Sequence, residues 1–177
     1  MGNLAGNLVA AAERHADNIA LKLDETEIPY AALEAASARV AGLLHLRGIG
    51  PDARVGIMLP NVPQFAVAYY GALRAGAVVV PMNPLLKARE VEFYLADSEA
   101  RLVFAWHEFA AAAEAGATAA GAEAVGVTPG AFERLLSSVE PKPDVIDREG
   151  DDTAVILYTS GTTGKPKGAE LTHRTWA

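Results

Sequence analysis

The chain has 177 residues, which is enough for one domain with a sizeable hydrophobic core. Its 51% hydrophobic and 21% charged residues are ordinary for a globular protein. A formal net charge of −7 gives the chain no general attraction for nucleic acid or for an anionic membrane, so any anion site has to be local. The absence of cysteine excludes disulfides, thiolate metal sites and a thiol nucleophile within this sequence.

The N-terminal residues 1–7 lack the charged start and long apolar run of a secretory signal peptide. No stretch approaches the roughly 18 uninterrupted apolar residues that a membrane-spanning helix needs. The four histidines lie too far apart in sequence to form a pair with metal-ligand spacing. We therefore expect a cytoplasmic protein without a membrane span.

The first elements expected are a short helix, a strand and a long helix. Asn3 can cap the short helix, and residues 19–23 have the composition of a strand. Residues 31–47 form an amphipathic helical pattern, and Gly48 occupies the position of a C-cap glycine. Pro29 precedes this helix closely, so a side-chain cap is missing, at a cost of about 1 kcal/mol.

Short apolar strands then alternate with helices. The strands expected are residues 54–59, 77–80 and 101–105, and the helices expected between and after them are residues 63–75 and 89–96. This alternation indicates βαβ units with a parallel sheet, and such strands are apolar throughout because helices cover both faces. The predicted fold class is α/β, in three layers with a mainly parallel sheet.

The second half of the chain carries less information until its end. Residues 109–126 are rich in alanine and glycine and are interpreted as a helix followed by a loop. Residues 140–150 contain two prolines and several charges, which is typical of a linker. Residues 154–158 are expected to form a strand, with residues 169–171 as its hairpin partner.

Between these two strands, residues 158–168 (YTSGTTGKPKG) concentrate hydroxyls, glycines and lysines. Hydroxyl side chains can donate to anionic oxygens, and glycine N–H groups can line an anion-binding concavity. Two lysines add positive charge. These are the groups that would hold a polyphosphate.

The loop is not a Walker A loop, which needs G-x-x-x-x-G-K-[ST]. The glycine that precedes Gly164 is Gly161, which is too close, and Pro166 replaces the hydroxyl that would bind magnesium. The alternative is a polar surface hairpin, but two lysines separated by proline after an apolar run favour phosphate binding. We expect at least one of Lys165 and Lys167 to contact phosphate, and the pattern does not choose between them.

Other polar and aromatic residues near the loop have competing interpretations. Ser160 is not surrounded by a G-x-S-x-G elbow, so a phosphate donor is favoured over a nucleophile. His173 could cap a helix, pair with Glu170 or reach an active site, and a structural role is slightly favoured. Trp106 and Trp176 are interpreted as packing residues.

Residues 154–173 (AVILYTSGTTGKPKGAELTH) resemble the phosphate-loop motif of the adenylate-forming enzymes, which include acyl-CoA synthetases, luciferases and peptide-synthetase adenylation domains. Four other segments resemble the same family: residues 55–61 (VGIMLPN), 72–77 (ALRAGA), 80–84 (VPMNP) and 94–98 (YLADS). The resemblance spans nearly the whole chain and is weakest between residues 107 and 145.

The resemblance implies that a carboxylate is activated with ATP and Mg²⁺ to an acyl-adenylate and pyrophosphate, and that the acyl group then passes to coenzyme A. It implies an acyl-CoA synthetase for a fatty or other aliphatic acid. By resemblance, the β- and γ-phosphates of ATP are held by Thr159, Ser160, Gly161, Thr162, Thr163, Gly164 and Lys165, with Lys167 assisting.

Residues 1–177 are then expected to be a partial N-terminal domain, without the rest of the large domain and without the C-terminal lid domain that carries the catalytic lysine. Such a piece should be inactive alone, and its apolar strand 154–158 should face solvent, so that it self-associates or is covered by a longer chain. Residues 160–167 should be weakly ordered without nucleotide. The alternative function is a non-catalytic module that binds nucleotide phosphates or a protein.

Overall fold

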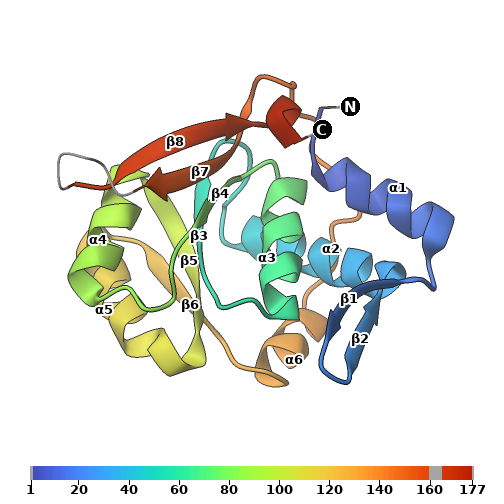
Figure 1. The fold of residues 1–177 in the computed structure, drawn as a ribbon, viewed down its shortest axis with the longest axis horizontal. Helices are drawn as coiled ribbons and strands as arrows, with labels where there is room; N and C mark the ends of the chain where they lie inside the picture. Colours follow the sequence, from blue (N-terminus) through green and yellow to red (C-terminus); the bar gives the residue numbers. More distant parts are fainter. Residues whose placement is uncertain (1, 160–164, 177) are drawn as a thin grey trace.

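The structure is a computed structural model that describes residues 2–159 and 165–176 (Figure 1). In chain order its elements are α1 (Ala5–His15), β1 (Ile19–Leu23), β2 (Thr26–Pro29), α2 (Tyr30–Leu46), β3 (Arg54–Met58), α3 (Pro63–Arg74), β4 (Val78–Pro81), α4 (Ala88–Asp97), β5 (Ala100–Trp106), η1 (His107–Phe109), α5 (Ala110–Ala120), β6 (Glu123–Val127), α6 (Ala131–Ser137), β7 (Thr153–Thr159), β8 (Lys167–Thr172) and η2 (His173–Trp176).

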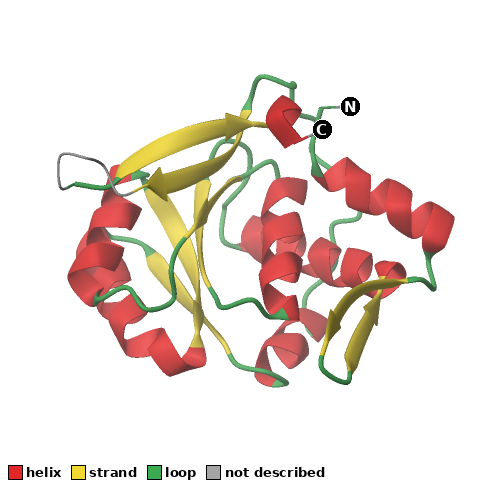
Figure 2. Cartoon of the chain, viewed as in Figure 1, coloured by secondary structure: helices red, strands yellow, loops and turns green. Residues whose placement is uncertain are grey.

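Six of the strands form one sheet in the order β6-β5-β3-β4-β7-β8. All neighbouring pairs are parallel except β7 and β8, which form an antiparallel hairpin at the edge. Helices α1, α2, α3 and α6 cover one face of the sheet, and α4 and α5 cover the other (Figures 1 and 2). The predicted three-layer α/β fold with a mainly parallel sheet is confirmed.

The central strand β3 shows why these strands are apolar throughout. Val55 and Ile57 pack into the core on the α2 and α3 face, whereas Met58 packs into the core on the α4 and α5 face. Successive side chains point to opposite faces of a strand, so a strand covered on both faces needs apolar residues at every position. The three strands predicted around residues 54–59, 77–80 and 101–105 are confirmed in this way.

The predicted helix ends also agree with the structure to within about two residues, the ordinary uncertainty of such boundaries. Gly48 and Gly76 have φ values of +66° and +75°, so both adopt the left-handed conformation that glycine accepts after a helix. Pro63 stands in the first turn of α3. No side-chain hydrogen bond caps α2, which begins directly after Pro29 as expected.

Three of the α-helices and β-strands were not predicted, and neither were the 3₁₀ helices η1 and η2. The end of the segment 109–126 was interpreted as a loop, but residues 123–127 form β6, the strand at one edge of the sheet. Val125 and Val127 on one face of β6 are buried, whereas Ala124 and Gly126 on the other face are half-buried and exposed, so residues 124–127 have the alternation of a half-buried strand. The hairpin partner β2 and the short helix α6 are the other two.

The predicted linker does contain no helix or strand, yet it is part of the folded structure. Its backbone N–H at Lys142 donates to the carbonyl oxygen of Ala38 at 2.9 Å, and the N–H of Ile146 donates to the carbonyl oxygen of Arg74 at 3.0 Å. The segment therefore runs across α2 and α3 and brings the chain back to the sheet at β7.

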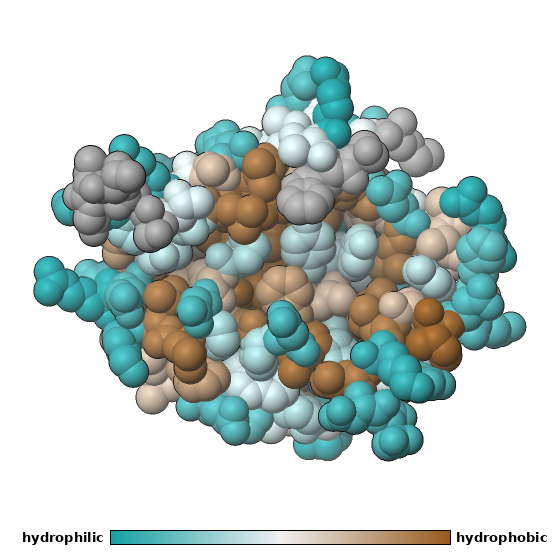
Figure 3. Space-filling view, viewed as in Figure 1, coloured by the Kyte–Doolittle hydropathy of each residue, from teal (hydrophilic) through white to brown (hydrophobic). Residues whose placement is uncertain are grey.

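The expectation that residues 154–158 face solvent was wrong for most of this strand. Ala154, Val155 and Ile156 are buried because β7 lies between β4 and β8 and contributes to the cores on both faces. Figure 3 shows hydrophobic residues on this side of the molecule as separate patches with hydrophilic residues between them. Within the described residues, we find no helix with the length and apolar character that crossing a membrane requires.

Candidate phosphate-binding site

The predicted phosphate loop joins β7 to β8 at the tip of the edge hairpin (Figure 1). Residues 160–164 lie outside the described part of the chain. The weak order predicted for residues 160–167 therefore falls mostly outside it, as do five of the predicted phosphate ligands. The hairpin places Thr159, the last residue of β7, opposite Lys167, the first residue of β8. Both side chains are exposed, so two of the predicted phosphate ligands come together at the mouth of the loop.

The next pair of residues down the hairpin is Tyr158 and Gly168. Because side chains alternate along a strand, this pair faces the side opposite to Thr159 and Lys167. A Cβ atom on Gly168 would lie 2.9 Å from Cγ2 of Ile156 and 3.3 Å from Cζ of Tyr158. Glycine at residue 168 thus leaves room for the side chains of both Ile156 and Tyr158.

The ring of Tyr158 packs against α4. Its centroid lies 4.4 Å from that of Tyr94 and 6.5 Å from that of Phe93. Its hydroxyl donates a hydrogen bond of 2.6 Å to Oδ2 of Asp97. Burial, together with the negative charge and hydrogen bond of Asp97, raises the pKa of Tyr158, so the hydroxyl keeps its proton at neutral pH.

The two lysines of the loop take different positions. Lys165 lines a cavity of about 360 Å³ together with Pro166 and with Arg89, Phe93 and Tyr94 of α4. Lys167 belongs to β8 instead. The structure therefore puts one lysine beside α4, in a cavity that is also lined by the carboxylate of Glu90, and the other at the mouth of the loop.

The hairpin passes over the amino-terminal ends of parallel strands, where two polar cavities of about 260 and 270 Å³ lie. Arg54 begins β3 and lines both cavities. Arg148 pairs with Asp52, and its Nε lies 3.1 Å from Oδ2 of Asp152. The hydrogen bond from Arg148 holds the pKa of Asp52 below its usual range despite an opposing contribution from desolvation. These carboxylates are thus engaged as ion pairs, and the described residues contain no cluster of acidic or histidine side chains arranged for a metal.

His173 lies at the end of β8 away from the loop, and it has a structural role. Its side chain is fully buried, and Nδ1 accepts a hydrogen bond from the backbone N–H of Leu4 at 3.1 Å. Glu170, which sequence reasoning considered as its partner, instead accepts a hydrogen bond from Thr153. Trp106 is buried in the core as predicted.

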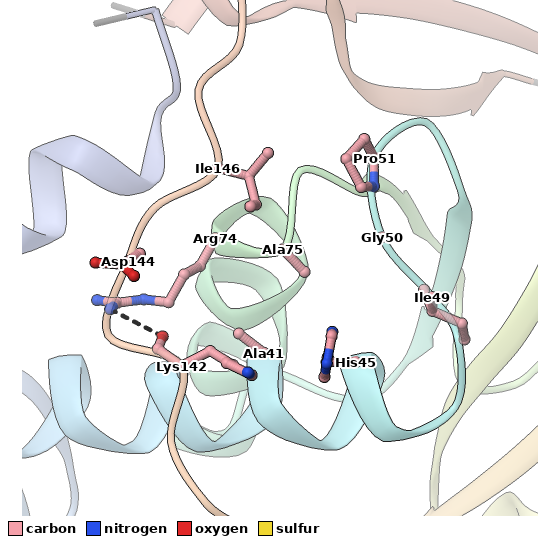
Figure 4. Close-up of a pocket in the computed structure, with 10 residues that line it drawn as sticks. All are labelled: Ala41, His45, Ile49, Gly50, Pro51, Arg74, Ala75, Lys142, Asp144 and Ile146. Atoms are coloured by element: carbon pink, nitrogen blue, oxygen red, sulfur yellow. Dashed lines mark hydrogen bonds between the residues drawn. The ribbon is translucent and has the colours of Figure 1, made fainter.

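A further cavity of about 270 Å³ lies between α2, α3 and the segment 142–146 (Figure 4). Its lining is mostly apolar, with His45, Lys142, Asp144 and Arg74 as its polar members. The buried guanidinium of Arg74 donates to the carbonyl oxygens of Lys142 and Pro143 and pairs with Glu34. This cavity therefore lies on the opposite face of the sheet from α4, and its arginine holds α2, α3 and the linker together.

Comparison with known proteins gives a consistent match. A family model described as "AMP-binding enzyme" matches residues 8–177. Over 155 residues the chain is 38% identical to the long-chain-fatty-acid–CoA ligase FadD13 of Mycobacterium tuberculosis, a match that covers 84% of this chain and 30% of that protein. It is 32% identical over 163 residues to surfactin synthase subunit 1 of Bacillus subtilis, covering 92% of this chain and 4% of that protein.

Solved structures agree with the sequence matches. A benzoate CoA ligase from Burkholderia xenovorans superimposes with a TM-score of 0.87 at 30% identity, over 97% of this chain and 35% of that one. The N-terminal domain of FACL13 from Mycobacterium tuberculosis gives a TM-score of 0.87 at 32% identity, over 98% of this chain and 45% of that one. The chain thus spans less than half the length of each of these relatives.

Proposed function

Since the chain belongs to the AMP-binding enzyme family, we propose that it is the N-terminal part of an ATP-dependent acyl-CoA synthetase. The whole enzyme would join a carboxylic acid to coenzyme A at the expense of ATP. The observation that carries this proposal is the hydroxyl, glycine and lysine loop of residues 158–168, placed at the tip of a hairpin in a chain that matches the family along nearly all its length.

The loop's task would be to hold the β- and γ-phosphates of ATP. The proposed ligands are Thr159, Ser160, Gly161, Thr162, Thr163, Gly164, Lys165 and Lys167. Hydroxyl and backbone N–H donors and two ammonium groups offer charge-assisted hydrogen bonds to these phosphates, and such donors position and neutralise the charge of the leaving group. Mg²⁺ would enter with the nucleotide as the substrate MgATP.

The reaction would proceed in two steps. An oxygen of the carboxylate attacks the α-phosphorus of ATP, the bond from that phosphorus to its bridging oxygen breaks, and pyrophosphate leaves. The thiol sulfur of coenzyme A then attacks the carbonyl carbon of the acyl-adenylate, and AMP leaves as the thiol proton is lost. The loop acts in the first step, because it holds the two phosphates that become pyrophosphate.

We propose a fatty acid as the carboxylate, on the similarity to a long-chain-fatty-acid–CoA ligase. The similarity to a surfactin synthase subunit favours a second candidate, an adenylation domain that passes its acyl group to another thiol. Single-turnover assays with coenzyme A and with a phosphopantetheine-bearing carrier protein would distinguish the two. Transfer to coenzyme A alone supports the synthetase, and transfer to the carrier alone contradicts it.

In this proposal residues 1–177 form a partial N-terminal domain that does not catalyse adenylation alone. The test is carboxylate-dependent exchange of labelled pyrophosphate into ATP, measured for the full-length enzyme and for the 177-residue chain. Exchange by the full-length enzyme only is the expected result. Absence of exchange by the full-length enzyme with every carboxylate tested would contradict adenylation. Exchange by the 177-residue chain would contradict the proposal that this chain is inactive alone.

A further inference from the structure

The position of the end of β7, where the phosphate loop begins, depends on contacts outside the sheet. β7 pairs with β4 at a single position, Val79 with Val155. Beyond that pair, the described residues of β7 have β8 alone as a strand neighbour, and β7 runs toward α4 (Figure 1). Because no backbone hydrogen bonds to β4 hold the hairpin beyond Val155, side-chain packing has to set the position of the hairpin there.

Tyr158 supplies that packing at the residue where the loop begins. Its hydroxyl donates to Asp97, and its ring lies on the ring of Tyr94, so one side chain contacts two successive turns of α4. Gly168 lies opposite Tyr158 on β8 and leaves room for its ring. Both strands that lead into the loop are therefore held against α4 through the same tyrosine.

A purely apolar packing role explains only part of this geometry. A phenylalanine would fill the same space and keep the contact with Tyr94. The hydroxyl adds a directional bond of 2.6 Å to Asp97, which is exposed and lies at the last position of α4. A hydrogen bond to a charged acceptor fixes direction as well as distance, so this bond sets how the hairpin is oriented against α4.

We propose that Tyr158 and Asp97 are positioning residues for the phosphates of ATP. They act through the start of the loop, because the bond between them fixes Tyr158 and the adjacent Thr159 in the place where Thr159 meets the nucleotide. This inference rests on the proposed function, since it concerns how the same loop binds ATP. Loss of the bond should weaken ATP binding and leave the affinity for the carboxylate unchanged.

The kinetic test uses the full-length enzyme and pyrophosphate exchange. We expect Tyr158→Phe and Asp97→Ala each to raise KM for ATP about tenfold, equivalent to about 1.4 kcal/mol. Asp97→Asn should restore most of the loss, because the asparagine oxygen still accepts the hydroxyl proton. The double variant Tyr158→Phe/Asp97→Ala should be no worse than either single variant, because the two residues act through one bond.

The matched control is Glu92→Ala, which removes an exposed carboxylate from the same helix. It should leave KM for ATP unchanged. Equal KM for ATP in the wild type and in Tyr158→Phe, or additive losses in the double variant, would overturn the positioning role.

A second readout does not depend on activity. Trypsin cleaves after Lys167, next to the Tyr158–Gly168 pair, and cleavage there requires the hairpin to open locally. Tyr158→Phe and Asp97→Ala should be cleaved at Lys167 several times faster than the wild type and Glu92→Ala, and equal rates would overturn the proposal. If the wild-type enzyme shows no exchange, the proposed function is contradicted, and the cleavage rates still show whether the bond holds the hairpin.

Discussion

Nδ1 of His173 accepts a hydrogen bond of 3.1 Å from the backbone N–H of Leu4, which joins the end of β8 to the start of α1. Because Nδ1 is the acceptor, it must be unprotonated for the bond to form. The side chain is also fully buried. Burial lowers the pKa of His173, the positive charge of Arg148 lowers it further, and Asp152 opposes both. The two ends of the described chain are thus held together by a neutral imidazole.

The first prediction is a loss of stability on acidification. Because the pKa of His173 is lower in the folded state, the unfolded state binds more protons below its own pKa of about 6.5. The contribution of His173 is complete above that pH and falls as the pH drops below it, by at most about 1.4 kcal/mol per pH unit. Urea denaturation at several pH values from 7.5 to 5 measures it.

The control for this prediction is His173→Asn, which keeps an acceptor oxygen for the Leu4 amide but does not titrate. Its unfolding free energy should depend less steeply on pH than that of the wild type over the same range. Two parallel curves would show that His173 does not cause the acid sensitivity.

The second prediction concerns the buried guanidinium of Arg74, whose side chain has no exposed surface and pairs with Glu34. Glu34→Ala leaves this charge with carbonyl acceptors only, so we expect it to destabilise the fold by about 3 kcal/mol. Glu34→Gln should cost less because it keeps an acceptor oxygen. The exposed Glu13 on α1 provides the control, and an equal effect of Glu13→Ala in the same denaturation assay would refute the argument.

The third prediction compares two helical glycines. A Cβ atom on Gly71 would lie 2.4 Å from Cβ and Cγ1 of the buried Val40, at the crossing of α2 and α3. Gly71→Ala should therefore cost about 1–3 kcal/mol through overpacking, more than its gain in helix propensity. On Gly6 a Cβ atom would meet nothing within 4 Å, so Gly6→Ala should stabilise by about 0.5 kcal/mol. Thermal unfolding of both variants checks the opposite signs, and a shift of both in the same direction would contradict the packing argument.

The parallel core could be predicted from the sequence because strands covered on both faces leave a local signal. The apolar run Val78-Val79-Val80 predicts a strand that is covered on both faces, and the glycine at residue 76 predicts the end of the preceding helix. β6 escaped prediction because its five residues include alanine and glycine, which carry little strand preference. Its place at the sheet edge comes from pairing with β5, which periodicity does not reveal.

The candidate site also has a part that the local sequence predicts and a part that only the folded chain shows. The residue types of the loop predict phosphate binding, which stays a prediction, and the predicted hairpin that carries the loop is confirmed. Its anchor was not, because Tyr158 and Asp97 are 61 residues apart and meet only in the folded chain. The same holds for Asn3, which was expected to cap α1. The N-cap position is instead Leu4, without a side-chain cap, and Oδ1 of Asn3 accepts a hydrogen bond from the N–H of Ala5. The side-chain amide of Asn3 donates to the carbonyl oxygens of Leu73 and Ile146, which lie far along the chain.

We propose that the loop of residues 158–168 holds the phosphates of ATP, and Lys165→Ala combined with Thr163→Ala in the full-length enzyme tests this role. Each lost charge-assisted hydrogen bond is worth about 1.5–3 kcal/mol, and 1.36 kcal/mol corresponds to about a factor of ten in rate. Carboxylate-dependent pyrophosphate exchange should therefore fall by about two orders of magnitude or more while the unfolding free energy stays unchanged. Unchanged ATP kinetics in the double variant would show that the phosphates bind elsewhere.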